Sequence, residues 1–250
     1  MSFAFDLRDG FENFKDFLIA LKEDFNNYKT IYKGRNEVKI LNKNTINLVV
    51  KSFKKPNLFK NLLYFLGKKS KAKKSYQNAF KIADFTPKAI AYIEFYDNFF
   101  LKNSYFISEK FEYDFTIREV LTNDKFKNKD EILKNFTKFS FDLHEKGILH
   151  LDYSAGNILV KDENENYIFK VVDINRMKFK ELNLNERLKN FSMLWLDDKD
   201  AKFIAKEYAK LYDKDEDICT KTMLNFSHNL KKRKNFKKRL KAILKGEKCR

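Results

Sequence analysis

The residues best suited to chemistry lie in a short segment from His150 to Asn157 and in a second segment that contains Asp173. Asp152 is followed five residues later by Asn157, between a predicted helix and a predicted hairpin, and Asp173 stands at the end of that hairpin. Phosphoryl transfer from ATP needs such a set, because one carboxylate orients the attacking hydroxyl and accepts its proton while an amide oxygen and another carboxylate hold Mg²⁺. The alternative is that Asp152 and Asn157 only cap turns, which is the usual role of these residue types.

The elements that must position these residues lie mainly in the second half of the chain. Apolar residues on one side predict a helix over residues 130–145, and Gly147 provides its C-terminal stop. The hairpin is predicted from residues 158–160 and 167–172, and further helices from residues 184–196, 200–212 and 230–244. The helix before the loop and the hairpin after it favour a catalytic site over simple turn capping.

The first half of the chain has a different pattern. Apolar residues at helical spacing predict an amphipathic helix over residues 11–25. Three strands in an antiparallel meander follow at residues 30–33, 37–41 and 47–53, then a helix at 70–83 and strands at 89–95 and 105–108. Strands first and helices second, with one hairpin in the helical part, indicate an α+β plan with two lobes.

This order of motifs resembles the protein-kinase-like superfamily and, within it, the bacterial lipopolysaccharide kinase (Kdo/WaaP) family, over roughly residues 30–195. The resemblance is carried by residues 143–150 (LHEKGILH) before the loop and by residues 173–176 (DINR) in place of Asp-Phe-Gly. It implies a protein-kinase-like two-lobed fold in a single domain over residues 1–250. Residues 1–108 would form the N-terminal helix and a small antiparallel-sheet ATP-binding lobe, and residues 109–250 a mainly helical catalytic lobe with a basic C-terminal helix.

The resemblance also implies roles for the residues of the loop. Asp152 corresponds to the catalytic base, and His150 to a scaffold residue that braces the loop. Asn157 and Asp173 correspond to the ligands of Mg²⁺.

The predicted ATP-binding half contains further candidates. Lys51 matches the strand lysine that pairs with the ATP phosphates, although outside this context it would be one solvated lysine among many. Gly34 is the single glycine of the predicted phosphate loop, and Arg35 beside it can reach phosphate oxygens. Glu109 to Phe111 fall where a hinge would contact adenine through its backbone.

Three departures from the protein-kinase pattern bear on function. Ser154 stands where kinases that act on Ser or Thr carry Lys, and no Ala-Pro-Glu segment follows Asp173, so both features favour an acceptor other than a protein. The predicted helix at 70–83 contains no Glu, and Gln77 stands about where the ion-pair partner of Lys51 is expected. Either Gln77 suffices, or another acid such as Glu94 serves, or the activity is weak.

Composition and charge limit the class of protein. The chain is 43% hydrophobic and 16% aromatic, enough for a core, and Cys219 and Cys249 match no metal or redox spacing. Asp6, Arg8 and Asp9 precede any apolar run, which argues against a signal peptide, and no apolar stretch approaches a membrane span. The composition therefore predicts a soluble intracellular protein in a reducing compartment.

The basic tail carries much of the charge. Residues 228–250 hold eleven Lys or Arg and one acid, a net charge of +10, against +7 for the rest of the chain. Basic residues surround an apolar side made of Leu230, Phe236, Leu240, Ile243 and Leu244, and this pattern suits an anionic membrane surface. Nucleic acid is the competing polyanion, but no recognised reading motif accompanies the tail, and a solvated helix in a lysine-rich proteome is the third interpretation.

The sequence therefore predicts an ATP- and Mg²⁺-dependent phosphotransferase acting on a sugar hydroxyl, by resemblance Kdo or a core sugar of lipopolysaccharide or lipid A. We expect a cytoplasmic monomer that is peripheral on the cytoplasmic face of the inner membrane and has no specific nucleic acid partner. The alternatives are an aminoglycoside-type or RIO-like kinase, and a kinase-like binding module without activity, which Gln77 and the single-glycine loop suggest.

Overall fold

The computed structural model describes residues 2–244 and divides into two compact units. The first unit runs to Glu112 and also contains Val171–Arg176, and the second consists of Tyr113–Lys170 and the chain from Met177 onward. The first unit thus extends slightly past the predicted division between residues 108 and 109. The first unit also includes the short segment Val171–Arg176, which begins at the end of the predicted hairpin.

A six-stranded antiparallel sheet forms the centre of the first unit, in the strand order β1-β5-β6-β4-β3-β2. The predicted meander is confirmed as β2–β4, and the second predicted pair of strands as β5 and β6. The sequence analysis missed β1, which pairs along its whole length with β5. The strands are β1 (Ser2–Leu7), β2 (Lys29–Lys33), β3 (Glu37–Lys43), β4 (Ile46–Ser52), β5 (Ala89–Asp97) and β6 (Phe100–Glu109).

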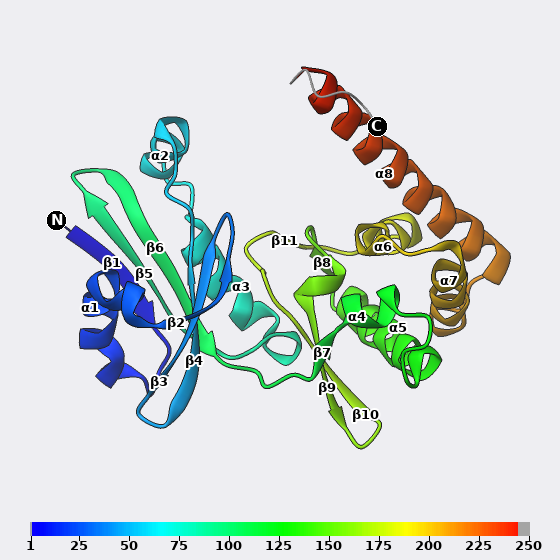
Figure 1. Cartoon of the computed structure of the whole chain (residues 1–250), viewed down its shortest axis with the longest axis horizontal. Helices are drawn as coiled ribbons and strands as arrows, with labels where there is room; N and C mark the ends of the chain where they lie inside the picture. Colours follow the sequence, from blue (N-terminus) through cyan, green and yellow to red (C-terminus); the bar gives the residue numbers. More distant parts are fainter. Residues whose placement is uncertain (1, 245–250) are drawn as a thin grey trace. The chain divides into compact units, whose positions relative to one another are not determined.

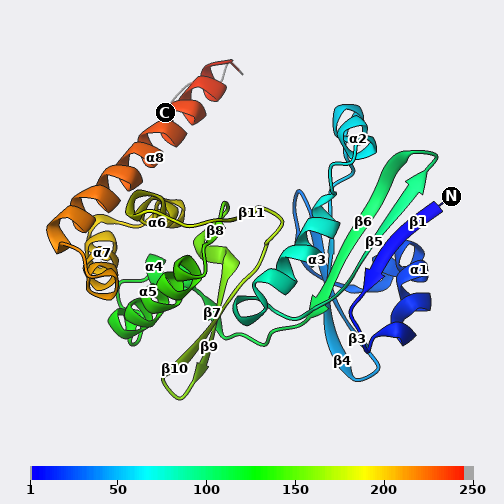
Figure 2. The ribbon, with the colours of Figure 1, turned by 180° about the vertical axis from the view of Figure 1, so that it is seen from behind.

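Two helices cover opposite faces of this sheet, as Figures 1 and 2 show. The predicted N-terminal helix is α1 (Lys15–Asp24), flanked by 3₁₀ turns at Glu12–Phe14 and Phe25–Asn27, and its apolar side packs on β4, β5 and β6. The predicted helix at 70–83 is α3 (Lys71–Lys81), which packs on the other face through Tyr76, 5.3 Å from the Tyr92 ring. Burial on both faces explains why β5 is apolar almost throughout.

An additional short helix, α2 (Leu58–Phe65), lies between β4 and α3 and was not predicted. Asn57 caps its N-terminus by accepting a hydrogen bond from the backbone N–H of Lys60. The helix is attached to β6 by Asn61, whose Oδ1 accepts a hydrogen bond from the backbone N–H of Leu101.

The second unit is mainly helical, as predicted. The helix before the loop is confirmed as α5, which ends at Glu145 just before Gly147, whose φ of +69° favours glycine. The hairpin is confirmed as β9–β10, and β7 adds a short third strand beside β9. The elements are β7 (Phe115–Thr116), α4 (Ile117–Thr122), α5 (Lys129–Glu145), β8 (Ile148–His150), β9 (Ile158–Glu163), β10 (Asn166–Val171), β11 (Met177–Phe179), α6 (Leu184–Phe191), α7 (Asp198–Tyr212) and α8 (Glu216–Leu244), with 3₁₀ turns at Ala155–Asn157 and Ser192–Leu194.

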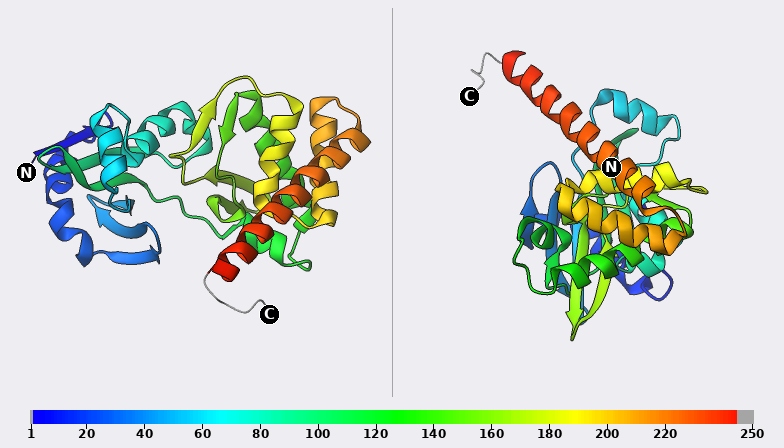
Figure 3. Two further views of the ribbon diagram at one scale, coloured as in Figure 1. Left: turned by 90° about the horizontal axis from the view of Figure 1, so that it is seen from above. Right: turned by 90° about the vertical axis from the view of Figure 1, so that its right-hand side faces the viewer.

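The predicted C-terminal helix is only the end of a longer one. Helix α8 begins at Glu216, and Cys219, Met223 and Leu230 in its first half are buried. Its second half extends away from α6 and α7 (Figure 3). Lys245, Glu247, Cys249 and Arg250 lie outside the described residues. Among residues 2–244, no helix is long and apolar enough to cross a membrane.

The core of the second unit contains a histidine that is held in its neutral form. His144 on α5 is fully buried, its Nδ1 lies 2.9 Å from the Tyr208 hydroxyl and its Nε2 lies 3.2 Å from Oδ1 of Asn190. Burial lowers the pKa of His144 to about 4; the hydrogen bond to Asn190 opposes this effect, and the charge of Arg187 adds to it.

This pKa predicts a specific loss of stability in acid. An unfolded histidine titrates near pH 6.5, so the unfolded chain binds the proton first. The stabilising contribution is complete above pH 6.5 and is lost as the pH falls toward 4, by about 1.4 kcal/mol per pH unit. We expect His144→Gln to remove this part of the pH dependence, measured as the free energy of unfolding in denaturant at pH 7 and pH 5. An equal acid loss in both proteins would assign it to other groups.

Candidate active site

The loop that carries Asp152 is built on a buried histidine. His150, the last residue of β8, is fully buried, and its Nδ1 accepts a hydrogen bond of 3.0 Å from the backbone N–H of Asp152. The carbonyl of Asp152 accepts two more, from the backbone N–H of Ser154 at 2.7 Å and from Nδ2 of Asn157 at 2.9 Å. The structure therefore brings together the three predicted loop residues, His150, Asp152 and Asn157.

The loop is also attached to the core of the second unit. Asn190 on α6 donates a hydrogen bond of 2.9 Å from its Nδ2 to the carbonyl of His150. Tyr153, directly after Asp152, is fully buried, and its hydroxyl lies 2.7 Å from Oγ of Ser140 on α5. Burial raises the pKa of the Tyr153 phenol, so it stays neutral and serves as a fixed hydrogen-bonding group. These contacts fix the backbone of the loop on both sides of Asp152.

The segment that carries Asp173 is attached to the first unit, although it directly follows β10. Thr86 donates a hydrogen bond of 2.8 Å from Oγ1 to the carbonyl of Val171. Asn78 on α3 donates another, of 2.7 Å, from its Nδ2 to the carbonyl of Ile174. Two side chains thus hold the backbone on either side of Asp173.

Lys51 and Asp173 form an ion pair in the first unit. Nζ of Lys51, on β4, lies 2.8 Å from Oδ1 of Asp173, and the two side chains are only 16% and 25% exposed. Asp173 has a φ of +59°, in the left-handed region that few non-glycine residues adopt, and Asn175 donates a hydrogen bond to the same carboxylate oxygen. Strained backbone of this kind is often found at functional sites.

The proposed pairing of Gln77 with Lys51 is not found. Oε1 of Gln77 accepts a hydrogen bond of 2.7 Å from Nζ of Lys69, whereas the charged partner of Lys51 is Asp173. The alternative acid, Glu94, accepts a hydrogen bond of 2.8 Å from the Tyr96 hydroxyl. Since Asn78 faces the segment that holds Asp173, Gln77, its neighbour in sequence, lies on a different side of α3.

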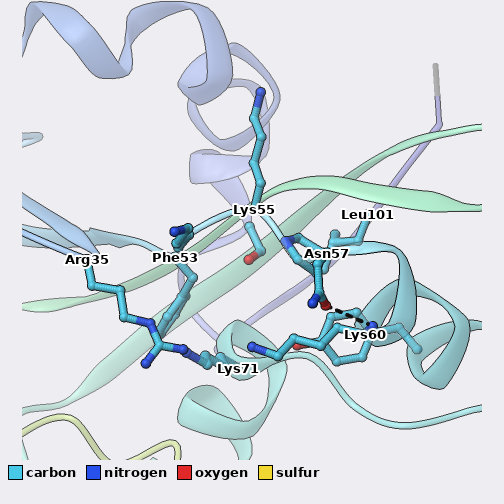
Figure 4. A pocket seen from close by; sticks show the side chains of 11 residues that line it. Arg35, Phe53, Lys55, Asn57, Lys60, Lys71 and Leu101 are labelled. Carbon is cyan, nitrogen blue, oxygen red and sulfur yellow. Dashed lines mark hydrogen bonds between the residues drawn. The ribbon is translucent and has the colours of Figure 1, made fainter. Parts of the chain in front are cut away.

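The loop between β2 and β3 contains Gly34 and Arg35. A Cβ on Gly34 would lie 2.5 Å from the hydroxyl of Tyr32, so a larger residue here would displace that exposed ring. Arg35 lines a cavity in the first unit together with Lys60 and Lys71, and Figure 4 shows these three side chains converging. The sequence analysis did not identify Lys60 or Lys71.

The predicted hinge lies at the end of the first unit. Glu109 is the last residue of β6, its backbone N–H donates to the carbonyl of Lys88, and its carboxylate pairs with Nζ of the same lysine at 2.9 Å. Phe111 is half-buried and directly precedes the end of the unit at Glu112.

Another residue absent from the prediction stands beside the loop. The guanidinium of Arg118, on α4, covers Gly156, since a Cβ on that glycine would lie 2.4 Å from one of its nitrogens. A cation this close to Asn157 suits a loop that handles phosphate, but an arginine thirty-eight residues earlier in the chain gives no sequence signal of its proximity.

Asn157 in the second unit and Asp173 in the first each offer a hard oxygen of the kind that divalent cations prefer. Among residues 2–244, no group of three or more His, Cys, Asp and Glu could hold a metal ion. Mg²⁺ at phosphates commonly uses only one or two protein ligands in addition to water and phosphate oxygens. The donor end of the Asn157 amide is used by the Asp152 carbonyl, which leaves its oxygen as the end suited to a cation.

Comparisons with known proteins bear on the identity of this site. The model of the lipopolysaccharide kinase (Kdo/WaaP) family matches residues 74–214, more than half of the chain. A solved structure of WaaP in complex with acyl carrier protein is similar, with a TM-score of 0.57 and 14% identity over 92% of this chain and 97% of that one. The Rio2 kinase of Chaetomium thermophilum, in an ADP/Mg²⁺-phosphoaspartate complex, has a TM-score of 0.48 and 12% identity over 82% and 65% of the two chains.

No match was found among curated proteins. The family match and the WaaP-like structure confirm the α+β, protein-kinase-like fold and the kinase class predicted from the loop. The chain is thus a kinase, and it belongs to the lipopolysaccharide kinase (Kdo/WaaP) family.

Proposed function

We propose that this kinase transfers the γ-phosphoryl group of ATP to a hydroxyl of a lipopolysaccharide sugar, either Kdo or a core sugar. The observation that carries the proposal is the ion pair between Lys51 and Asp173, 2.8 Å apart. It joins an ammonium suited to binding phosphates with a carboxylate suited to binding Mg²⁺. Mg²⁺, when bound, neutralises charge on the transferred phosphate. Asp173 and Asn157 are its proposed ligands. Lys51 would then pair with phosphate oxygens.

In the proposed reaction, Asp152 accepts the proton of the acceptor hydroxyl. The hydroxyl oxygen forms a bond to the γ-phosphorus as the bond between that phosphorus and the bridging oxygen breaks, and ADP leaves with the electron pair. His150 acts as a positioning residue, because its Nδ1 holds the backbone N–H of Asp152. Gly34, Arg35 and the backbone of Glu109 to Phe111 are proposed to contact the nucleotide.

One observation favours a second candidate, a kinase-like binding module without activity. Helix α3 contains no acid, so no glutamate in it can pair with Lys51. Incubation with ATP, Mg²⁺ and Kdo-bearing lipid A, followed by mass spectrometry for a gain of one phosphate, separates the two. An aminoglycoside or a protein substrate phosphorylated in place of the sugar would indicate the alternative kinase classes.

Substitutions at the two carboxylates should separate chemistry from binding. We expect Asp152→Ala to lower kcat by a factor on the order of 10²–10⁴ with nucleotide affinity retained, because a general base acts mainly in the transition state. Asp173→Asn should instead abolish Mg²⁺-dependent nucleotide binding, measured by calorimetry. Turnover like that of the unaltered chain in Asp152→Ala would contradict the assignment.

Gln77 and Lys51 should differ in their effect on nucleotide binding. Since Gln77 bonds to Lys69, we expect Gln77→Leu to change ATP affinity by less than about twofold, whereas Lys51→Met should weaken it by about tenfold or more through loss of a charged hydrogen bond. Titration with ATP and Mg²⁺ measures both. A strong loss in Gln77→Leu would show that the nucleotide brings this residue to the site.

The C-terminal part of α8 is proposed to bind an anionic membrane surface. Leu230, which the sequence analysis placed on the apolar side of the tail, is buried in the second unit. Phe236, Leu240, Ile243 and Leu244 are 42–84% exposed, and among the described residues no acid follows Leu230. An exposed apolar side surrounded by lysine and arginine is typical of interfacial helices.

Deletion of residues 231–250 tests this role. We expect it to weaken salt-sensitive binding to anionic vesicles by about tenfold or more, because each Lys or Arg near such a surface contributes about 1 kcal/mol. Phosphorylation of a lipid-embedded acceptor should slow, whereas turnover on a truncated, water-soluble acceptor should stay nearly unchanged. The control is the melting temperature, which should fall only slightly, because Leu230 remains in place and the loss is limited to the hydrogen bond of Lys231 to the carbonyl of Leu196. Equal vesicle binding with and without the tail would contradict the proposal.

A further inference from the structure

Helix α2 has the reverse of the usual arrangement for a helix on a protein surface. Its buried side chain is the polar Asn61, which bonds to β6. Five apolar residues in the helix or directly after it are instead 53–78% exposed, whereas Leu63 and Tyr64 are half-buried. We call the surface that the five form with Phe99 the α2 face: Leu58, Phe59, Leu62, Phe65 and Leu66, with the Phe99 ring 5.6 Å from that of Phe65. Exposed apolar patches of this kind mark interaction sites.

A cationic cavity lies beside the α2 face. Its volume is about 250 Å³, and its charged lining consists of Arg35, Lys54, Lys55, Lys60 and Lys71. The side chains of Arg35, Lys60 and Lys71 converge from three elements, whereas Lys55 points away (Figure 4). Burial, together with the charges of Arg35 and Lys60, lowers the pKa of Lys71, although the charge of Asp173 opposes this effect.

The sequence around the cavity contains no opposing charge. Residues 51–83 include ten lysines and no Asp or Glu. Lys54, Lys55, Lys60, Lys68 and Lys69 are all exposed and flank the two ends and one side of α2. The part of the rim formed by residues 51–83 is therefore entirely cationic, and the exposed Asp97 near Phe99 is paired with Lys102 at 3.4 Å.

We propose that α2 is a second membrane-docking element, with its apolar face in the acyl layer of an anionic bilayer and a lipid phosphate bound by Lys60 on the α2 side of the cavity, apart from Arg35, which is proposed to contact the nucleotide. The charge pattern favours lipid over a protein partner, because a ring of lysines around leucine and phenylalanine matches a layer of phosphates above acyl chains. The helix is too short to span a membrane and fits only the interface. The proposal rests on α2 and its cavity and does not depend on the sugar acceptor or on the tail.

Fluorescence at α2 gives a direct test with the full chain. Trp195 is the only tryptophan, so a Trp195→Phe background allows a reporter at Leu62→Trp. With phosphatidylcholine vesicles that contain phosphatidylglycerol, we expect its emission to shift to shorter wavelength and to be quenched by brominated acyl chains. The matched control is Phe3→Trp, at an aromatic residue of the same unit that is 44% exposed and outside the α2 face, which should show neither effect.

Measurements of vesicle affinity separate the contribution of the apolar α2 face from that of the lysines around it. Phe59→Ser should weaken vesicle binding by about tenfold or more, and Phe3→Ser should not change it. Lys60→Gln should weaken it by about fivefold and only on anionic vesicles. Arg35 and Lys71 are left intact, because Lys71 also interacts with Lys51 and Asp173.

Several outcomes would overturn the proposal. One is a Leu62→Trp spectrum that does not respond to vesicles; another is unchanged vesicle affinity in Phe59→Ser. A concentration-dependent shift without lipid would assign the α2 face to self-association, and a shift only with an acidic protein would assign it to a protein partner. Inorganic phosphate that competes as well as lipid does would assign the cavity to a soluble phosphate. Kinase activity on a soluble acceptor, measured in parallel, keeps these outcomes distinct from failure of the proposed function.

Discussion

The ion pair between Lys51 and Asp173 joins the central sheet of the first unit to the segment Val171–Arg176, which the chain reaches only after the first part of the second unit, Tyr113–Lys170. Lys51 is largely buried on a central strand, and a buried ammonium without a counter-charge is costly. Helix α3, which packs on the sheet near Lys51 and Asp173, offers no acid. The carboxylate comes instead from a segment that follows β10 and then returns to the second unit at Met177. Thr86 and Asn78 hold the backbone of this segment, so the charge pair does not have to fix the segment alone.

Buried polar groups in the core of the second unit hold the backbone at Asp152 in place, as Thr86 and Asn78 do for Asp173. Asn190 bonds to two different histidines through its two amide atoms: Oδ1 accepts from Nε2 of His144 at 3.2 Å, and Nδ2 donates to the carbonyl of His150 at 2.9 Å. His150 in turn holds the backbone N–H of Asp152. Buried polar groups that are fully hydrogen-bonded rigidify a structure, whereas a missing partner is costly. The neutral state of His144 thus belongs to the same network that positions the loop.

The sequence was sufficient to predict those helices whose buried residues recur at helical spacing. Helices α1 and α5 present apolar residues to a core at helical spacing, and the loop after α5 is identified by the types and order of its residues. Gln77 was misplaced because contact depends on the side of a helix: Lys71 and Asn78, seven residues apart, share the side that faces Asp173, and Gln77 is rotated by about 100° from Asn78. Helix α2 was missed because its apolar residues face outward and no core pattern marks it.

The distribution of charge also differs from the one inferred from the tail alone. Of the formal net charge of +17, residues 51–83 and residues 228–250 account for +10 each, which leaves −3 for the remainder of the chain. A lysine-rich composition spread by mutation would raise the charge of every segment, so it does not explain an acidic remainder. In the described residues, both basic segments also carry leucine and phenylalanine that are exposed, on α2 and on the end of α8. The two proposed membrane contacts rest on this association of exposed apolar residues with acid-free clusters of lysine, because a bilayer offers an anionic surface with an apolar interior and a nucleic acid does not.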